Sequence, residues 1–92
     1  MPTLSMEDSW LMRVECLNDA GTRQAVLFLM KQARARDIRT DNSTGTAVIE
    51  AAYYKMDNLP AVLQRIQDDL RRMPEVLDVF IQDNPTVIRQ AP

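Results

Sequence analysis

The sequence has 92 residues, which is enough for one domain with a single modest hydrophobic core. Its 11 basic and 13 acidic residues give a net charge of −2, which argues against broad binding to nucleic acid or to an anionic membrane surface. The chain has no histidine and one cysteine, so it lacks the usual general base near neutral pH and cannot form an internal disulfide or a two-cysteine metal site.

The first predicted strand covers Trp10–Leu17, where alternate residues fall on two faces. Cys16 shares a face with the apolar residues of this strand, which predicts a buried thiol. The cluster Asn18–Thr22 follows and predicts a turn, in which either Asp19 or Thr22 can cap the next helix.

The next predicted element is a helix over Thr22–Arg36. Four apolar residues spaced at i, i+3, i+4 and i+7 form one stripe on it: Val26, Leu29, Met30 and Ala33. The end of this helix is basic, which suits the negative pole of the helix dipole, through Lys31, Arg34 and Arg36.

A short strand over Ile38–Asp41 and a strand over Thr46–Met56 are predicted to form a hairpin. Asn42–Gly45 reads as its turn, and Gly45 is the residue that can take a positive φ. Tyr53 and Tyr54 are adjacent in the second of these strands, so only one of the two rings can face outward.

A second helix is predicted over Leu59–Met73, capped by Asp57–Asn58 and stopped by Pro74. Asp68 and Arg72 lie four apart on its outer face and can pair there. Its apolar stripe is the cleanest in the chain: Leu59, Val62, Leu63, Ile66, Leu70 and Met73.

A last strand is predicted over Val76–Ile81, with one apolar face formed by Leu77, Val79 and Ile81. We expect the second helix to pack on this strand and on the first and third strands. The expected core contacts join Leu63, Ile66 and Leu70 to Val14, Ile49 and Val79.

The order βαββαβ predicts an α+β fold, the ferredoxin-like plait, with a four-stranded antiparallel sheet and two helices on one face. The expected organisation is a flexible N-terminal segment at 1–9, one domain at 10–81 and a C-terminal tail at 82–92. This fold hosts enzymes, RNA binders, metal carriers and regulatory domains, so the function depends on a few loop and surface residues.

Two helices on one face leave the other face of the sheet open, and its predicted residues carry few charges. Monomers rarely expose an apolar patch of this size, so we expect a homodimer, or a missing partner, to cover it. The expected interface residues are Leu11, Leu17, Val48, Ala52, Tyr54 and Phe80.

The loop before the first helix is the candidate ligand site, because free backbone N–H groups at a helix N-terminus suit an anionic or carboxylate-bearing molecule. Gly21 lets such a group approach the backbone, or it simply permits the turn. The candidate residues are Asn18, Asp19, Ala20, Gly21 and Thr22.

Other chemistries are poorly supported. Gly21 and Gly45 are the two glycines of the chain, so there is no glycine-rich phosphate loop. The adjacent Asp68 and Asp69 lie on a helix flank and read as a solvated face. The RNP1 pattern of RNA-binding plaits is missing. We therefore expect no enzyme, no cofactor, no metal site and no nucleic-acid partner.

Several stretches resemble an ACT domain, the small regulatory module of amino-acid metabolic enzymes and of bifunctional (p)ppGpp synthetase/hydrolases. The resemblance covers about residues 10–81. The matching stretches are Arg13–Glu15 leading into Asn18–Gly21, Ala47–Glu50, Leu63-x-x-Ile66, and Met73–Val79.

The Asp-x-Pro-Gly pattern of the ACT ligand loop stands here as Asn18-Asp19-Ala20-Gly21, with Asn at the Asp position and Ala at the Pro position. The turn and the Val14–Cys16 stretch are also similar to the ACT-like C-terminal domain of MgtC-type membrane proteins.

The resemblance implies a non-catalytic regulatory domain that dimerises and senses a small ligand such as an amino acid, within a larger protein. ACT-like domains, as the resemblance implies, also pair edge to edge through a strand or through the first helix.

Two alternative functions remain: a structural assembly module without a ligand, and an acylphosphatase-like enzyme, although Asn18–Thr22 supplies no arginine-bearing phosphate loop. With no signal peptide and no apolar stretch of membrane-spanning length, we expect a cytoplasmic location with no membrane contact of this segment, either as a cytosolic protein or as the soluble domain of a membrane protein.

Overall fold

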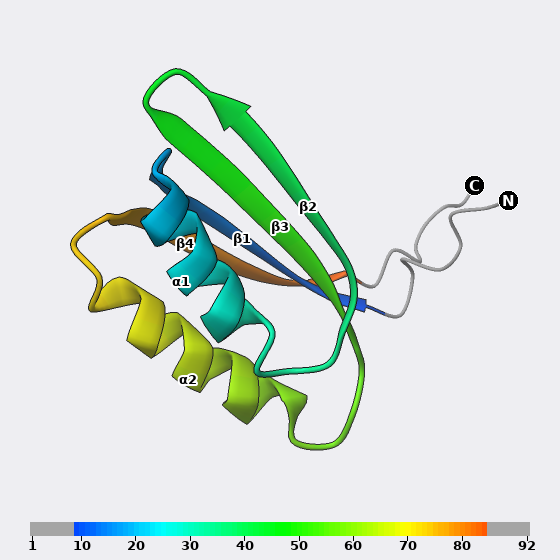
Figure 1. Cartoon of the computed structure of the whole chain (residues 1–92). Helices are drawn as coiled ribbons and strands as arrows, with labels where there is room; N and C mark the ends of the chain where they lie inside the picture. Colours follow the sequence, from blue (N-terminus) through cyan, green and yellow to red (C-terminus); the bar gives the residue numbers. More distant parts are fainter. Residues whose placement is uncertain (1–8, 85–92) are drawn as a thin grey trace, which may run out of the picture.

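The computed structural model describes residues 9–84 and confirms the βαββαβ order (Figure 1). The predictions for 1–8 and 85–92 lie outside the described residues. The elements in chain order are β1 (Ser9–Leu17), α1 (Ala20–Met30), β2 (Ala35–Ser43), β3 (Thr46–Tyr54), α2 (Leu59–Arg71) and β4 (Val76–Asn84).

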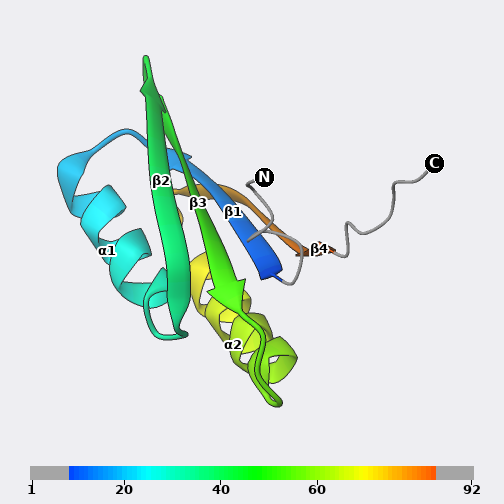
Figure 2. The same ribbon diagram turned by 90° about the vertical axis from the view of Figure 1, so that its right-hand side faces the viewer.

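The four strands form one antiparallel sheet, as predicted, and their order in it is β2-β3-β1-β4. Both helices lie on the same side of this sheet (Figure 2). The described part of the chain, residues 9–84, is therefore two layers thick, and neither α1 nor α2 lies over the second face of the sheet.

The core lies between the sheet and the two helices. Leu63, Ile66 and Leu70 of α2 are fully buried, and so are Val14, Ile49 and Val79 on the facing strands, as the sequence predicts. Cys16 is also buried, which confirms the prediction of a core thiol. The apolar stripe of α1 reaches the same core.

The predicted end of the first helix is wrong. The sequence favours a helix to Arg36, but α1 ends at Met30, and the Lys31 amide donates to the Leu27 carbonyl oxygen at 2.9 Å as a closing turn. The Tyr53 hydroxyl of β3 donates to the Met30 carbonyl oxygen at 2.7 Å, so a side chain of the sheet satisfies the helix end. Lys31 stands at the C-cap, where its charge suits the helix dipole, but Arg34 and Arg36 lie beyond the helix, and their expected match to the dipole is not found.

Pairing across the sheet also moves several strand ends. β2 covers nine residues where the sequence predicts only Ile38–Asp41, because its mostly exposed polar residues give little periodic signal. At the other edge, β4 continues to Asn84, since Ser9 of β1 pairs there with Asn84. β3 ends at Tyr54, two residues before the predicted end.

Leu77 is not part of the core, contrary to the predicted alternation. The register shifts in β4, because Cys16 pairs with Val76 whereas Glu15 pairs with Asp78. Leu77 is thus the extra residue of a β-bulge, and its side chain is 51% exposed.

The turns and caps agree in part with the sequence. Gly45 has a φ of 84°, as the hairpin turn requires. Asn58 stands at the N-cap of α2 but forms no side-chain capping hydrogen bond. The predicted Asp68–Arg72 pair is replaced by an exposed one, in which Arg72 Nη1 lies 3.4 Å from Asp69 Oδ1.

Candidate functional site

The loop between β1 and α1 is held by the Asp19 side chain. Asp19 is the N-cap of α1, and its Oδ2 accepts hydrogen bonds from the Thr22 amide at 3.0 Å and the Thr22 hydroxyl at 2.9 Å. The hydrogen bond from the Thr22 hydroxyl is the main cause that lowers the pKa of this carboxyl group; the Thr22 amide and the charge of Arg23 add to it. The loop therefore carries a negative charge of its own at the helix N-terminus.

Asn18 ties this loop to the β2–β3 hairpin. Its Nδ2 donates to the Ser43 carbonyl oxygen at 3.1 Å, while its Oδ1 accepts from Arg23. The backbone amide of Asn18 also donates to the Gly45 carbonyl oxygen at 3.1 Å. An aspartate at this position could not donate to Ser43, so the asparagine that replaces the aspartate of the ACT pattern has a structural role here.

Gly21 lies in the first turn of α1 and has no positive φ. A Cβ atom there would meet only Asp19 Oδ2, at 3.6 Å, which is an ordinary contact. The turn itself does not require glycine, so the interpretation that Gly21 simply permits it finds no support. The amides of Ala20 and Gly21 precede the first helical hydrogen bond, which Arg23 donates to the Asp19 carbonyl oxygen at 2.9 Å.

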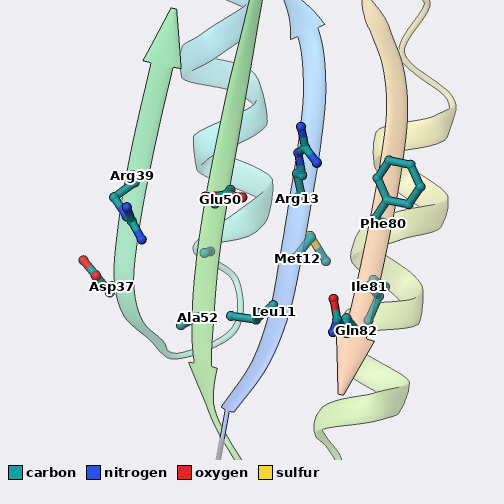
Figure 3. A pocket seen from close by; sticks show the side chains of 11 residues that line it. Leu11, Met12, Arg13, Asp37, Arg39, Glu50, Ala52, Phe80, Ile81 and Gln82 are labelled. Carbon is teal, nitrogen blue, oxygen red and sulfur yellow. The ribbon is translucent and has the colours of Figure 1, made fainter. Parts of the chain in front are cut away.

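The open face of the sheet carries a shallow concavity of about 630 Å³ (Figure 3). Figure 3 shows its outward side chains in two lines across the strands, one formed by Arg39, Glu50, Arg13 and Phe80. The second line, one pleat along, consists of Asp37, Ala52, Leu11 and Gln82.

The predicted interface residues differ in how far they reach solvent. Leu17, Tyr54 and Phe80 are exposed at 42%, 46% and 54%, respectively. Leu11 and Val48 are half-buried. Ala52 is buried, so it forms the floor of the concavity and is not available for broad contact.

Tyr54 also supports a basic corner of the molecule. The guanidinium groups of Arg34 and Arg36 lie 5.1 Å and 5.2 Å from the centre of its ring. Both distances are within the range of cation–π attraction. These arginines, which the sequence places in a helix, instead hold the rim of the open face.

The open face is more charged than the sequence suggests. Arg13 and Glu50 face each other across β1 and β3, and Arg39 faces Glu50 across β2 and β3. Because the sequence predicts only four residues of β2, Asp37 falls outside every predicted element, and the place of Arg39 beside Glu50 is not foreseen. Counting residue pairs outward from the hairpin turn, where Ser43 pairs with Thr46, was the signal that could have found this.

Three further properties of the described residues concern metal binding, thiol chemistry and membrane spans. In the part of the chain that the structure describes, no three His, Cys, Asp or Glu side chains come together in a way that could hold a metal ion. Burial raises the pKa of the Cys16 thiol, against a smaller opposing effect of Arg23. Within residues 9–84, no helix is both long and apolar enough to cross a membrane.

No family model and no curated protein matches the sequence. Solved structures do match the fold. The crystal structure of the ACT domain from GTP pyrophosphokinase of Chlorobium tepidum superposes with a TM-score of 0.67 at 15% identity, over 79% of this chain and 95% of that one. The chain has an ACT-like fold.

Two solution structures agree. The same Chlorobium tepidum ACT domain determined by NMR gives a TM-score of 0.68 at 15% identity, over 83% of this chain and 86% of that one. The C-terminal domain of the MgtC protein from Mycobacterium tuberculosis gives a TM-score of 0.65 at 19% identity, over 90% of this chain and 96% of that one. Both resemblances read from the sequence are thus confirmed for the fold of this ACT-like domain.

Proposed function

We propose that this ACT-like domain is a non-catalytic regulatory module that works by self-association through the open face of its sheet. The observation that carries the proposal is the exposure of Leu17, Tyr54 and Phe80 on a face that no helix covers. The helices bury most of the other face, whereas these three large apolar side chains remain exposed on the open face and are available to a partner.

Two further observations support a non-catalytic role. The chain has no histidine, and its cysteine is buried with a raised pKa, so neither of the usual neutral-pH nucleophile systems can form. The domains that match its fold bear names of parts of larger proteins, a GTP pyrophosphokinase and MgtC. By analogy, we place this domain in the cytoplasmic part of a larger protein.

Sedimentation equilibrium of the whole chain tests the self-association. We expect a dimer at micromolar concentration, and Val48→Glu should shift it to monomer because a charge then enters the contact, with the far-UV circular dichroism unchanged. Phe28→Glu is the matched control: Phe28 is 70% exposed, but on α1, behind the sheet. A wild-type chain that stays monomeric at high micromolar concentration contradicts the proposal. Dissociation by Phe28→Glu with Val48→Glu unaffected would instead place the interface on the helix side.

A second part of the proposal concerns ligand sensing at Asn18–Thr22. The free amides of Ala20 and Gly21 favour a carboxylate or another small anion, whereas the Asp19 carboxylate opposes it. Asp19→Asn keeps a capping side chain and removes the charge, so it should tighten anion binding.

A thermal-shift screen with amino acids and nucleotides identifies the ligand, since a molecule that binds only the folded state raises the melting temperature. On titration with this ligand, the changes in amide NMR chemical shift should be largest at Asn18–Thr22. In Asp19→Asn they should reach half of their maximum at a lower ligand concentration than in wild type. Shifts confined to the sheet or to Tyr53–Asp57 would refute this placement. If no compound raises the melting temperature, the structural assembly module without a ligand is the better description.

A further inference from the structure

The charges of the open face form two neighbouring rows of opposite sign. The first, here called the arginine row, crosses all four strands as Arg39, Glu50, Arg13 and Phe80. The second, here called the acidic row, lies two residues further along β1 and crosses the same strands as Asp41, Val48, Glu15 and Asp78. The arginine row carries a net charge of +1 and the acidic row −3, counted over these residues.

Four of these charges have no ion-pair partner among residues 9–84. Arg13 and Arg39 form no ion pair with any residue of the described chain, and neither do Glu15 and Asp41. Asp78 accepts a hydrogen bond from the Val79 amide at 2.9 Å, which leaves its charge in place. A partner that presents the reverse pattern would therefore find both rows available.

A second copy of this chain presents that pattern. Building on the self-association proposed above, we propose that two copies pack open face to open face about a two-fold axis that crosses the strands between the two rows. The arginine row of each copy then covers the acidic row of the other. Each strand runs antiparallel over the same strand of the partner, an alignment that packed sheets allow within about 30°.

This placement fixes which side chains meet. Arg13 faces the partner's Glu15, and Arg39 faces the partner's Asp41, so the two-fold axis gives four opposite-charge contacts. Along β1 the same symmetry places Leu11 opposite the partner's Leu17. The register is consistent on the neighbouring strands, because both rows are continuous across β2, β3 and β1.

The size of the face is sufficient. Strands of nine residues are about 30 Å long and four of them about 19 Å wide, so each copy would bury roughly 600 Å². The total of about 1,200 Å² lies at the lower limit for a specific interface, which predicts a reversible dimer.

An alternative two-fold axis runs parallel to the strands, between β1 and β3. It would set Asp41 against the partner's Asp78, and this like-charge contact disfavours that arrangement.

A charge exchange between two variants tests this register. Arg13→Glu/Arg39→Glu makes both rows acidic, and Glu15→Arg/Asp41→Arg makes both rows mainly basic. The dimer dissociation constant of each variant alone should be at least about 10-fold higher than that of wild type, because like charges then face each other. A 1:1 mixture should restore a heterodimer, seen by sedimentation equilibrium and native mass spectrometry. Added salt should weaken the wild-type dimer.

The control for Arg13→Glu/Arg39→Glu is Lys31→Glu/Arg65→Glu. It makes the same change in net charge at exposed positions away from the open face, and it should leave the dimer intact. A wild-type dimer whose variants do not restore association on mixing overturns the register and leaves the proposed self-association standing. Tighter association of the single variant Asp41→Arg would instead favour the parallel axis, which sets this residue against the partner's Asp78, and would overturn the proposal, in which it meets the partner's Arg39. A monomeric wild type overturns both.

Discussion

Tyr53 connects the sheet to the end of α1. Its ring is buried in the core, and its hydroxyl donates to the carbonyl oxygen of Met30, the last residue of the helix. Burial raises the pKa of this phenol, so the hydroxyl stays protonated and remains a donor. One side chain thus satisfies a helix end that carries no glycine or proline signal.

Tyr53→Phe should lower the free energy of unfolding by about 1–3 kcal/mol, because the Met30 carbonyl oxygen would remain buried without its hydrogen bond. Urea denaturation measures the change. Tyr54→Phe removes a hydroxyl from a half-exposed ring and should change stability by less than about 0.5 kcal/mol. Equal effects of the two substitutions would mean that the Tyr53 hydrogen bond adds nothing.

Of the two helices, α2 contributes more large buried side chains to the core. Its residues Leu59, Leu63, Ile66 and Leu70 are all fully buried. Ile66→Ala should destabilise the domain by roughly 2–5 kcal/mol in chemical denaturation, the usual cost of such a cavity. Arg65→Ala, one residue away on the exposed side, is the control. A loss below about 0.5 kcal/mol for Ile66→Ala would contradict the observed orientation of α2.

The elements also differ in how well the sequence predicts them. α2 was predicted within two residues of its observed end, because it has a strong helical period and a proline stop. The end of α1 could not be found in this way, since Lys31–Arg36 contains good helix formers and the helix is stopped by Tyr53 and by the pairing of β2, both distant in sequence. The exposed edge strand β2 was underestimated for want of an apolar alternation.

The candidate site shows the same division. The Asp19 cap is local and could be read from the sequence. The link from Asn18 to Ser43 and the two charge rows depend on the register of four strands, which short-range patterns do not specify.

At the scale of the whole molecule, the domain is thin. Its shortest extent is 17 Å, the thickness of one sheet and one helix layer. A two-layer domain of this size has a large share of its surface on the open face, so whatever contacts that face affects the behaviour of the entire domain. This supports the proposal that regulation acts through the sheet surface as well as through the β1–α1 loop.

The pairing of Ser9 with Asn84 has a mechanical consequence. The polypeptide enters β1 and leaves β4 at neighbouring points of one antiparallel ladder. A tension applied through these two points would open the ladder from that end, one pair of hydrogen bonds after another, without loading all of them at once. The domain would yield to a small force in this direction, and β4 would peel away first and uncover the backbone edge of β1. In a larger protein, a force transmitted through this domain would thus separate β4 from β1 before it disrupted the rest of the fold.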